Sequence, residues 1–560
     1  MQATVKRHGA RNPMRKMALF AGLCVLTISG SCLVGVPLLP EAAGAIVVHA
    51  SSPQQGSVHV AVRDAASGAL IPSRIRFEGL GLSRTPDVRA PRRDSALVDT
   101  VVAAGGEVTL PLPPGDYRIF CTRGPEWTIA VRELRVVADR RATLAIRLTH
   151  VTQPGDWVAS DFHVHSDESP DSAVSAEQRV ASLLAEGVRF AVSTEHNIAT
   201  TYPEDALAQP AGERLGTTAG VEITTWSPEV GHFNAFPVPI DLHAARRGAP
   251  AFRGQTPASV FAAVHALSPD TIVQVNHPRL EGHIAYFDLH ALDRASGKGA
   301  ESLSVDFDAL EVWNGFDLAR PEAVREVMSD WMALLAEGHH IVATGNSDSH
   351  GIRHHLPGYP RTYVSVPGGR NEDPALITRA LRAGRAFVTS GPLLDVRAAS
   401  ADEHAIHGPG DSVSLRDAAR RVDVRVQVRA PGWMDVRVIE LWVGGRLVRT
   451  VRIAPGTMSE RRSKLRAESK PDVELAAMGV RFDRTLSFDA LRDTFVVVVA
   501  RGERTMDALM GRRGVLPFAF SNPIWIDSDG DGLHRAVAAS PTPRPTQAAA
   551  PARLAPNEAP

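Results

Sequence analysis

Residues 161–171 place two histidines one residue apart and follow them with several carboxylates. On an extended strand, residues i and i+2 point to the same side, so His163 and His165 would direct both imidazoles towards one point. Two converging imidazoles suit a metal ion, but an isolated His-x-His pair also fits the solvent face of a surface strand. Further candidate ligands elsewhere in the chain would favour the metal site over the surface strand.

Further candidate ligands follow the short strands that we expect later in the chain. Strands are expected at residues 190–194, 220–223, 271–275, 308–313 and 341–346, and the polar residues at or near their ends include His196, Glu222, His277, Asp348 and His350. In parallel α/β architectures the carboxyl ends of the strands share one face, so residues far apart in sequence would converge there. No CxxC pair is present. The sequence therefore predicts a metal site of imidazole and carboxylate ligands.

Helix-length segments alternate with these strands and would position them. Residues 175–186 have a helical period, with Ser175 as the expected N-cap and Gly187 as the stop, and residues 256–267 and 321–337 are also expected to be helical. Alternating strands and helices indicate an α/β fold with a parallel sheet or barrel and helices outside it, over residues 155–395.

Both flanks of this module have the short alternating runs and Gly/Pro turns of β-sandwich domains. They span residues 55–150 and 396–532, and the turn at residues 112–117 resembles carboxypeptidase-regulatory-like β domains. The aspartate-rich residues 527–532 resemble a calcium loop but lack the distal Glu of an EF-hand, so we interpret them as a turn-rich terminus. Residues 533–560 are rich in Ala and Pro, which predicts a disordered tail.

Charge and length set further bounds. The 560 residues suggest several domains, and 61 Lys and Arg against 62 Asp and Glu give a net charge of −1, which argues against a nucleic-acid partner.

Five basic residues precede an uncharged run at residues 17–39, which predicts a signal peptide within residues 1–45 or an uncleaved anchor; Cys32 adds a lipoprotein alternative. We expect an exported protein that is periplasmic, secreted or anchored facing outside. A membrane is a partner only if this segment is not cleaved, and the sequence gives no oligomeric state.

Six motifs in order carry a family resemblance. They are Asp161-Phe162-His163-Val164-His165-Ser166, Thr194-Glu195-His196-Asn197, Gly220-Val221-Glu222, Gly231-His232-Phe233-Asn234, Asn276-His277-Pro278 and Ser347-Asp348-Ser349-His350. Together they resemble the PHP (polymerase and histidinol phosphatase) superfamily and, within it, the CehA/McbA-type metallohydrolases. The resemblance implies a distorted barrel of about seven βα units, here a (β/α)7 PHP barrel flanked by the two β-sandwich domains, and two or three divalent zinc, manganese or iron ions.

The resemblance also implies how the ligands divide among the metals. One metal would be held by His163, His165, Glu222 and Asp348; Glu222 would bridge to a second, held also by His196 and His277; His350 and Asp171 would complete a third position, with His232 as a further candidate. Glu195 stands where many relatives carry Asp, which implies a supporting role. Pro170 shifts the carboxylate of Asp171 by one residue from the family's Ser-Asp-Gly.

These residues predict a metal-dependent hydrolase. A divalent metal lowers the pKa of a bound water from about 15.7 toward roughly 7 and so generates a hydroxide nucleophile. The residues expected to carry catalysis are His163, His196, Asp348, His350 and Arg279, the last as a contact for a small anionic substrate. A phosphoester is the first expected substrate. The alternatives are a carbamate, ester or amide hydrolase and a metal-bearing surface binding module with little activity.

Overall fold

The structure, a computed structural model, describes residues 55–88, 99–152, 155–208, 210–280, 284–353, 355–400, 405–415, 420–453, 479–511 and 514–532. The predicted export segment at residues 1–45 and the predicted tail at residues 533–560 lie outside the described residues. Among the described residues, no helix is both long and apolar enough to cross a membrane.

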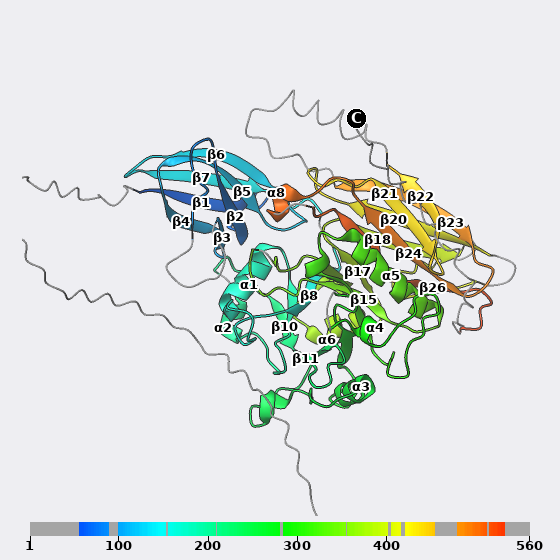
Figure 1. The fold of residues 1–560 in the computed structure, drawn as a ribbon. Helices are drawn as coiled ribbons and strands as arrows, with labels where there is room; N and C mark the ends of the chain where they lie inside the picture. Colours follow the sequence, from blue (N-terminus) through cyan, green and yellow to red (C-terminus); the bar gives the residue numbers. More distant parts are fainter. Residues whose placement is uncertain are drawn as a thin grey trace, which may run out of the picture. The chain divides into compact units, whose positions relative to one another are not determined.

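The N-terminal part forms two sheets around one core. Its strands are β1 (Gly56–Asp64), β2 (Ser73–Gly79), β3 (Thr100–Ala103), β4 (Glu107–Leu112), β5 (Gly115–Thr122), β6 (Ala130–Val136) and β7 (Arg141–Leu148). They pair in the orders β4-β1-β7 and β3-β2-β5-β6 (Figure 1). Alternate residues of β1, such as Val58 and Val60, are buried in the shared core, as expected for a strand with one face in a sandwich.

The middle part alternates strands and helices. Its strands are β8 (Trp157–Val164), β9 (Phe190–Ser193), β10 (Gly216–Ala219), β11 (Val221–Thr224), β12 (His232–Phe236), β13 (Ile272–Val275), β14 (Ala309–Asn314), β15 (Val342–Asn346), β16 (Arg361–Ser365) and β17 (Ala386–Thr389). Its helices are α1 (Ala176–Ala185), α2 (Glu204–Leu207), α3 (Pro257–His265), α4 (Tyr286–Leu289), α5 (Pro321–Ala336) and α6 (Pro374–Arg382), with 3-10 turns η1 (Ala245–Gly248), η2 (Gly315–Asp317) and η3 (Pro367–Gly369).

Local sequence signals explain the ends of these helices. Ser175 accepts a hydrogen bond from the backbone of Gln178 and Gln178 caps in return, so α1 begins with the predicted N-cap. Gly187 follows the helix with φ of 75°, a conformation that favours glycine. Helices α3 and α5 also lie within the segments predicted from periodicity, and each has a proline in its first turn.

The strands of the middle part do not close into one continuous sheet. One sheet follows the order β11-β12-β13-β14-β15, and the other begins β10-β9-β8-β16-β17. Isolated parallel bridges join Val164 to Ser349 and His196 to Glu222 across the two sheets. The α/β alternation is thus present, but a single closed seven-unit barrel is not confirmed. The physical reason is that β12 and β16 pair antiparallel with their neighbours and interrupt the repeating parallel units.

The C-terminal strands extend the second sheet. They are β18 (Leu393–Ser400), β19 (Ser412–Ser414), β20 (Arg421–Arg429), β21 (Val438–Val443), β22 (Arg446–Arg452), β23 (Val480–Asp489), β24 (Thr494–Arg501), β25 (Phe518–Ser521) and β26 (Ile524–Asp527), with a short helix α8 (Asp507–Met510). Strand β17 pairs with β25, and the sheet continues through β24 and β21 to β22. A separate sheet, β18-β20-β23, shares its hydrophobic core. The middle and C-terminal parts, which we expected to divide after residue 395, therefore share one continuous sheet.

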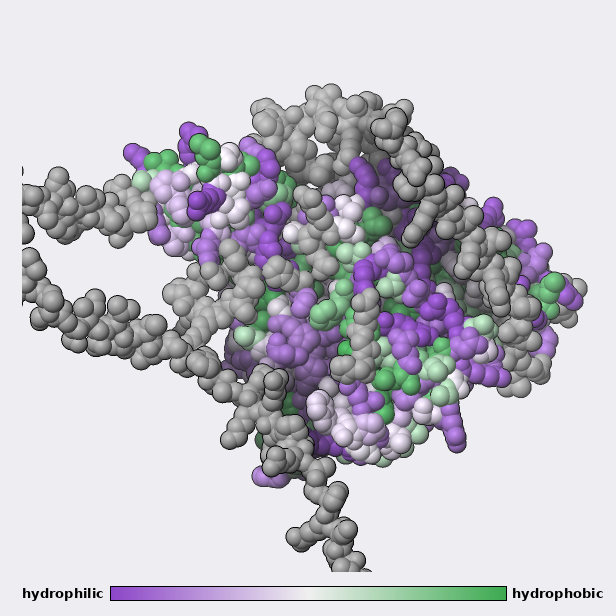
Figure 2. All heavy atoms as spheres, in the orientation of Figure 1, coloured by the Kyte–Doolittle hydropathy of each residue, from purple (hydrophilic) through white to green (hydrophobic). Residues whose placement is uncertain are grey.

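Strand β22, at the edge of the second sheet, carries several exposed arginines. It exposes Arg446, Arg449 and Arg452, beside the exposed Leu447 and Val448, and the coloured surface in Figure 2 carries both hydrophilic and hydrophobic side chains. Charges on an outer strand oppose pairing with another chain.

Candidate metal centre

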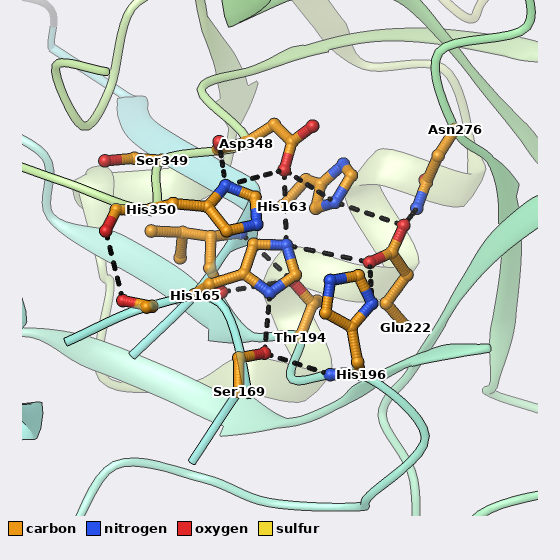
Figure 3. Close-up of polar contacts among 12 residues, drawn as sticks. His163, His165, Ser169, Thr194, His196, Glu222, Asn276, Asp348, Ser349 and His350 are labelled. Carbon is orange, nitrogen blue, oxygen red and sulfur yellow. Dashed lines mark hydrogen bonds and ion pairs between the residues drawn. The ribbon is translucent and has the colours of Figure 1, made fainter. Parts of the chain in front are cut away.

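The candidate ligands come from several strands of the middle part and meet in one place (Figure 3). His163 and His165 lie at the end of β8, while His196, His277 and Asp348 follow β9, β13 and β15. Two of these residues have a backbone that is unusual outside glycine: φ is 28° at His277 and 47° at Asp348. Such conformations are costly, and they persist where the surrounding structure holds a functional geometry.

Glu222 occupies the middle of the cluster and is 1% exposed. Its Oε1 lies 3.5 Å from Nε2 of both His163 and His277. Its Oε2 lies 2.8 Å from Nδ1 of His196 and 3.6 Å from Nε2 of His165. Glu222 lies within strand β11, as His163 lies within β8 and His232 within β12, whereas the other predicted ligands lie outside the strands. The central place of Glu222 is where a residue with the implied bridging role would have to lie, and that role stays a prediction.

Asp348 forms a second point of convergence. Its Oδ1 lies 3.3 Å from Nε2 of His163, 3.2 Å from Nε2 of His165 and 3.6 Å from Nδ1 of His350. Asn314 donates a hydrogen bond of 3.0 Å to its other oxygen. The carboxylate is thus held in place and faces three imidazoles.

Asp171 joins the cluster in spite of the shift caused by Pro170. Its Oδ2 lies 3.0 Å from Nε2 of His196 and 3.2 Å from Nε2 of His350. Its side chain is 49% exposed, whereas those of His163 and His165 are fully buried. The cluster therefore has a dry interior and an edge that opens to solvent at Asp171.

His232 contacts the other side of Glu222. Its Nδ1 lies 3.2 Å from Oε1 of Glu222, and its Nε2 lies 3.6 Å from a carboxylate oxygen of Glu229. His232 is on β12, opposite Thr224 of β11, so the β11–β12 pairing brings His232 to the cluster. The structure thus brings together all nine predicted metal ligands: His163, His165, Asp171, His196, Glu222, His232, His277, Asp348 and His350.

The donor atoms of this cluster fit a divalent metal. Four groups of them each lie within 4.8 Å of one another: His165, Asp171, His196 and His350; His163, His277 and Asp348; His163, His165 and Glu222; and Glu222, His232 and His277. Within the described residues, Nε2 of His163 and Nε2 of His165 are buried atoms without a hydrogen-bond partner. Buried polar atoms normally have partners. Nitrogen and oxygen donors that converge in this way are the arrangement that a zinc, manganese or iron ion would satisfy.

Among the side chains of the cluster, electrostatics favour ionised carboxylates and protonated histidines, except that burial lowers the pKa of His165. Burial opposes the charge on His163, but the carboxylates of Asp348, Glu311 and Glu222 outweigh it and hold the pKa of His163 well above its ordinary value. Burial also opposes the charge on His196, yet the neighbouring carboxylates raise its pKa to about 10. Burial would raise the pKa of Glu222, but the surrounding histidines hold it well below its usual range. A metal ion that binds His163 or His196 must therefore displace a proton from the imidazole, whereas Glu222 is already ionised.

Glu311 is a supporting residue that the sequence reasoning missed. It lies in β14, is 1% exposed, and accepts a hydrogen bond of 3.0 Å from Nδ1 of His163. Its other oxygen accepts a bond of 2.8 Å from the backbone N–H of His277. A carboxylate can only accept here, so Nδ1 of His163 carries the proton and Nε2 is directed at the cluster. A charged residue inside a strand with apolar neighbours was the signal that could have identified it.

Arg179 and Glu195 hold the loops that carry the ligands. Arg179, fully buried on α1, donates to the backbone carbonyls of His165, Ser349 and Gly351 at 2.8–2.9 Å. Glu195 accepts hydrogen bonds of 2.9–3.0 Å from the backbone N–H of Ser166. Glu195 thus supports the first histidine pair from behind, which matches its implied role.

Arg279 does not have the setting expected of a substrate contact. Its Nε and one terminal nitrogen donate to the buried carboxylate of Asp330, at 2.9 and 3.2 Å, and the other terminal nitrogen lies 2.5 Å from Asp288. It also donates to the carbonyl of Leu292. These bonds occupy the guanidinium within the fold, so the structure assigns Arg279 a role in packing the β13–α4 connection against α5.

The aspartate-rich turn at residues 527–532 forms the expected compact turn. Asp527 accepts hydrogen bonds from the backbone N–H groups of Gly530 and Gly532 at 2.8 and 2.9 Å. Its carboxylate lies near those of Asp493 and Asp529. These bonds account for the buried Asp527 as a turn-stabilising residue.

Comparison with known proteins adds only weak similarities. No protein-family model and no curated protein matches the chain. Among solved structures, a two-domain protein from Bacteroides vulgatus, described as containing a predicted PHP-like metal-dependent phosphoesterase, is 15% identical with a TM-score of 0.31, over 67% of this chain and 97% of that one. A minor pilin of Streptococcus agalactiae is 13% identical with a TM-score of 0.16, over 18% of this chain and 47% of that one. A streptococcal ancillary pilin is 12% identical with a TM-score of 0.15, over 20% and 38%. These likenesses are too low to carry an argument about function.

Proposed function

We propose that this protein is a metal-dependent hydrolase of the PHP type, close to the CehA/McbA group, that acts on a phosphoester. The observation that carries the proposal is that buried histidine nitrogens converge on the carboxylates of Glu222 and Asp348. Two of these nitrogens, Nε2 of His163 and Nε2 of His165, have no hydrogen-bond partner among the described residues. Two or three divalent ions of zinc, manganese or iron would satisfy these donors. Bound there, a divalent cation lowers the pKa of water and offsets negative charge on a phosphoryl or carbonyl oxygen.

The residues of the chain itself divide between an enclosed side and an open side. His163 and Glu222 are 0% and 1% exposed and exclude bulk water, which strengthens electrostatic interactions around them. His196, His350 and Asp171 line the open side, where their side chains are 16%, 17% and 49% exposed. A substrate would approach from this side. His196 and His350 would hold a metal ion on this side, next to the approaching substrate.

The reaction class can be tested with the purified full chain loaded with zinc or manganese. We expect bound metal by elemental analysis and hydrolysis of p-nitrophenyl phosphate esters above that of aryl carbamates. His163→Ala should lose both metal and activity. His265→Ala is the matched control. His265 lies on α3, pairs with Asp308 at 3.2 Å and does not belong to the cluster of candidate ligands.

Each outcome assigns a different function. Faster turnover of carbamates than of phosphate esters would replace the phosphoesterase by a carbamate or ester hydrolase of the same fold. Equal background rates for wild type and His163→Ala on both substrates would indicate a metal-bearing binding module. A protein that retains no transition metal would refute the proposal as a whole.

We further propose that the protein is exported. Support comes from the basic residues before the uncharged run at residues 17–39. Cell fractionation should find the mature chain outside the cytoplasm, and recovery of it in the cytosol would contradict the proposal.

A further inference from the structure

A large aromatic side chain stands at the rim of the metal centre. Phe316 lies in η2, directly after β14, and is 40% exposed, whereas the flanking Gly315 and Asp317 are buried. Its ring centroid lies 6.3 Å from that of His350, edge to face, and 4.6 Å from that of His355. His350 is one of the residues on the open side of the cluster. Phe316 therefore presents apolar surface to solvent beside the place where a substrate would enter.

The backbone of Phe316 is tied to the metal centre. Asn314 accepts a hydrogen bond of 2.9 Å from the N–H of Phe316, and its amide donates a bond of 3.0 Å to Asp348. A Cβ at Gly315 would lie 2.1 Å from the carbonyl oxygen of Ser347, so glycine is required for this close approach. The backbone that carries the aromatic ring is thus held in a fixed relation to the candidate ligands and does not belong to an independent loop.

The backbone beside the partner ring, that of His355, is held as well. The hydroxyl of Ser349 donates a hydrogen bond of 2.5 Å to the carbonyl of His355. The same segment carries Arg353, whose guanidinium pairs through two nitrogens with Asp99 of the N-terminal sandwich at 2.5 Å. A two-point Arg–carboxylate pair restricts orientation as well as distance. The β-sandwich therefore anchors the segment that brings His350 and His355 to the site.

A ring held in this way would bind a flat apolar group at little entropic cost. An aromatic side chain that serves only the core is normally buried, whereas Phe316 keeps a substantial part of its surface exposed. Preorganised aromatic surface favours binding because little side-chain freedom is lost, and offset or edge-to-face rings attract one another beyond their area burial.

We propose that Phe316 and His355 form an apolar subsite that binds an aryl or similarly flat apolar group of the substrate, while its phosphoryl or carbonyl end occupies the metal centre. This inference rests on the proposed function and names the substrate class as aryl or apolar esters, in place of small hydrophilic phosphates.

The test compares two ligands that share one headgroup. Phenylphosphonate and methylphosphonate are titrated calorimetrically into the zinc-loaded full chain, as wild type, Phe316→Ala and Phe316→Tyr. We expect Phe316→Ala to bind phenylphosphonate about tenfold more weakly, equivalent to ~1.4 kcal/mol. Methylphosphonate affinity and metal content should not change, and Phe316→Tyr should retain the wild-type affinity. Leu447→Ala, which removes an apolar side chain 48% exposed on β22, is the matched control.

The outcomes separate this inference from the proposed function. An equal loss of affinity for both phosphonates in Phe316→Ala would overturn the proposed subsite, because the ring would then support only the metal centre. Unchanged affinity for phenylphosphonate would overturn it too, and metal-dependent hydrolysis could still stand. A selective loss of phenylphosphonate binding in a protein that hydrolyses no ester would support the subsite and refute the hydrolase.

Discussion

Replacing Glu311 by glutamine should weaken metal binding although no candidate ligand is removed. One oxygen of Glu311 accepts from Nδ1 of His163 and from the amide of Asn346, both at 3.0 Å. The other accepts from the backbone N–H of His277 at 2.8 Å and from the amide of Asn314 at 2.9 Å. The carboxylate is thus surrounded by donors. A glutamine has the same shape but must turn its NH2 group towards one pair of them.

Either orientation of the glutamine is unfavourable. If its NH2 group faces His163, that nitrogen must become an acceptor, so the ring proton moves to Nε2, the atom directed at the cluster. If it faces His277, two donors oppose each other in a buried place. The neighbouring amides cannot turn over to relieve this, because Oδ1 of Asn346 accepts from Phe162 and Oδ1 of Asn314 accepts from Phe316.

The expected effect follows from the bond that is lost. A hydrogen bond to a charged group contributes about 1.5–3 kcal/mol. With ~1.4 kcal/mol for each factor of ten, metal affinity should fall roughly 10- to 100-fold. The assay is competition of the protein with a chelating dye for Zn²⁺ or Mn²⁺ at neutral pH, with circular dichroism as a check on folding.

Glu440→Gln is the matched control for this prediction. Glu440 is also a buried carboxylate, 4% exposed, but it pairs with Arg325 and Arg501 at 3.2 and 3.0 Å in the C-terminal sheet. Its substitution should lower thermal stability and leave metal affinity unchanged. A folded Glu311→Gln protein with wild-type metal affinity would refute the reasoning that Glu311 sets the proton position on His163.

Three further outcomes follow from the structure. Arg279→Ala should lower the free energy of unfolding by about 1–3 kcal/mol in thermal unfolding, since among the described residues the buried Asp330 then keeps Arg294, at 2.8 Å, as its one ion-pair partner. KM should stay unchanged, and a selective rise in KM would restore Arg279 as a substrate contact. The pKa of His196 is raised from 6.5 to about 10 in the metal-free protein. Its contribution to stability is therefore full below pH 6.5 and is lost as the pH rises towards 10. In the same window metal uptake should release protons and tighten with pH, which calorimetry in buffers of different ionisation enthalpy would show; uptake without proton release would contradict this charge state. Arg179→Met removes the bonds to the carbonyls of the two ligand-bearing loops and should weaken metal binding about tenfold in the dye assay, and an unchanged affinity would show that the loops hold their geometry without it.

Local features of the sequence were sufficient to predict some of the helices and strands of the middle part, but not β12, β16, β17 or α6. The Ser175 cap and the Gly187 stop define α1, because capping and backbone preference act within a few residues. Helices α3 and α5 lie within the segments predicted from periodicity. His163 and His165 were recognised as a pair because alternation along a strand is also a local property.

Tertiary contacts decided the features that depend on distant segments. Glu311 appeared to belong to an apolar strand until the structure placed it against His163, 148 residues away in sequence. Arg279 was expected at the substrate, yet Asp330 on α5 binds it. The sheet that runs from β17 into β25 also could not be read from either segment alone, since backbone pairing carries no local signal of its partner.

The nine candidate ligands illustrate the same division. The sequence by itself determined their chemical types and placed most of them at strand ends, which was enough to predict a metal site. Only the tertiary structure decided that Asp171 reaches His196 and His350 in spite of Pro170, and that Glu222 lies between the histidines. Distances of 3–4 Å between side chains depend on how β8, β11 and β15 pack against one another, and that packing is set by the whole core.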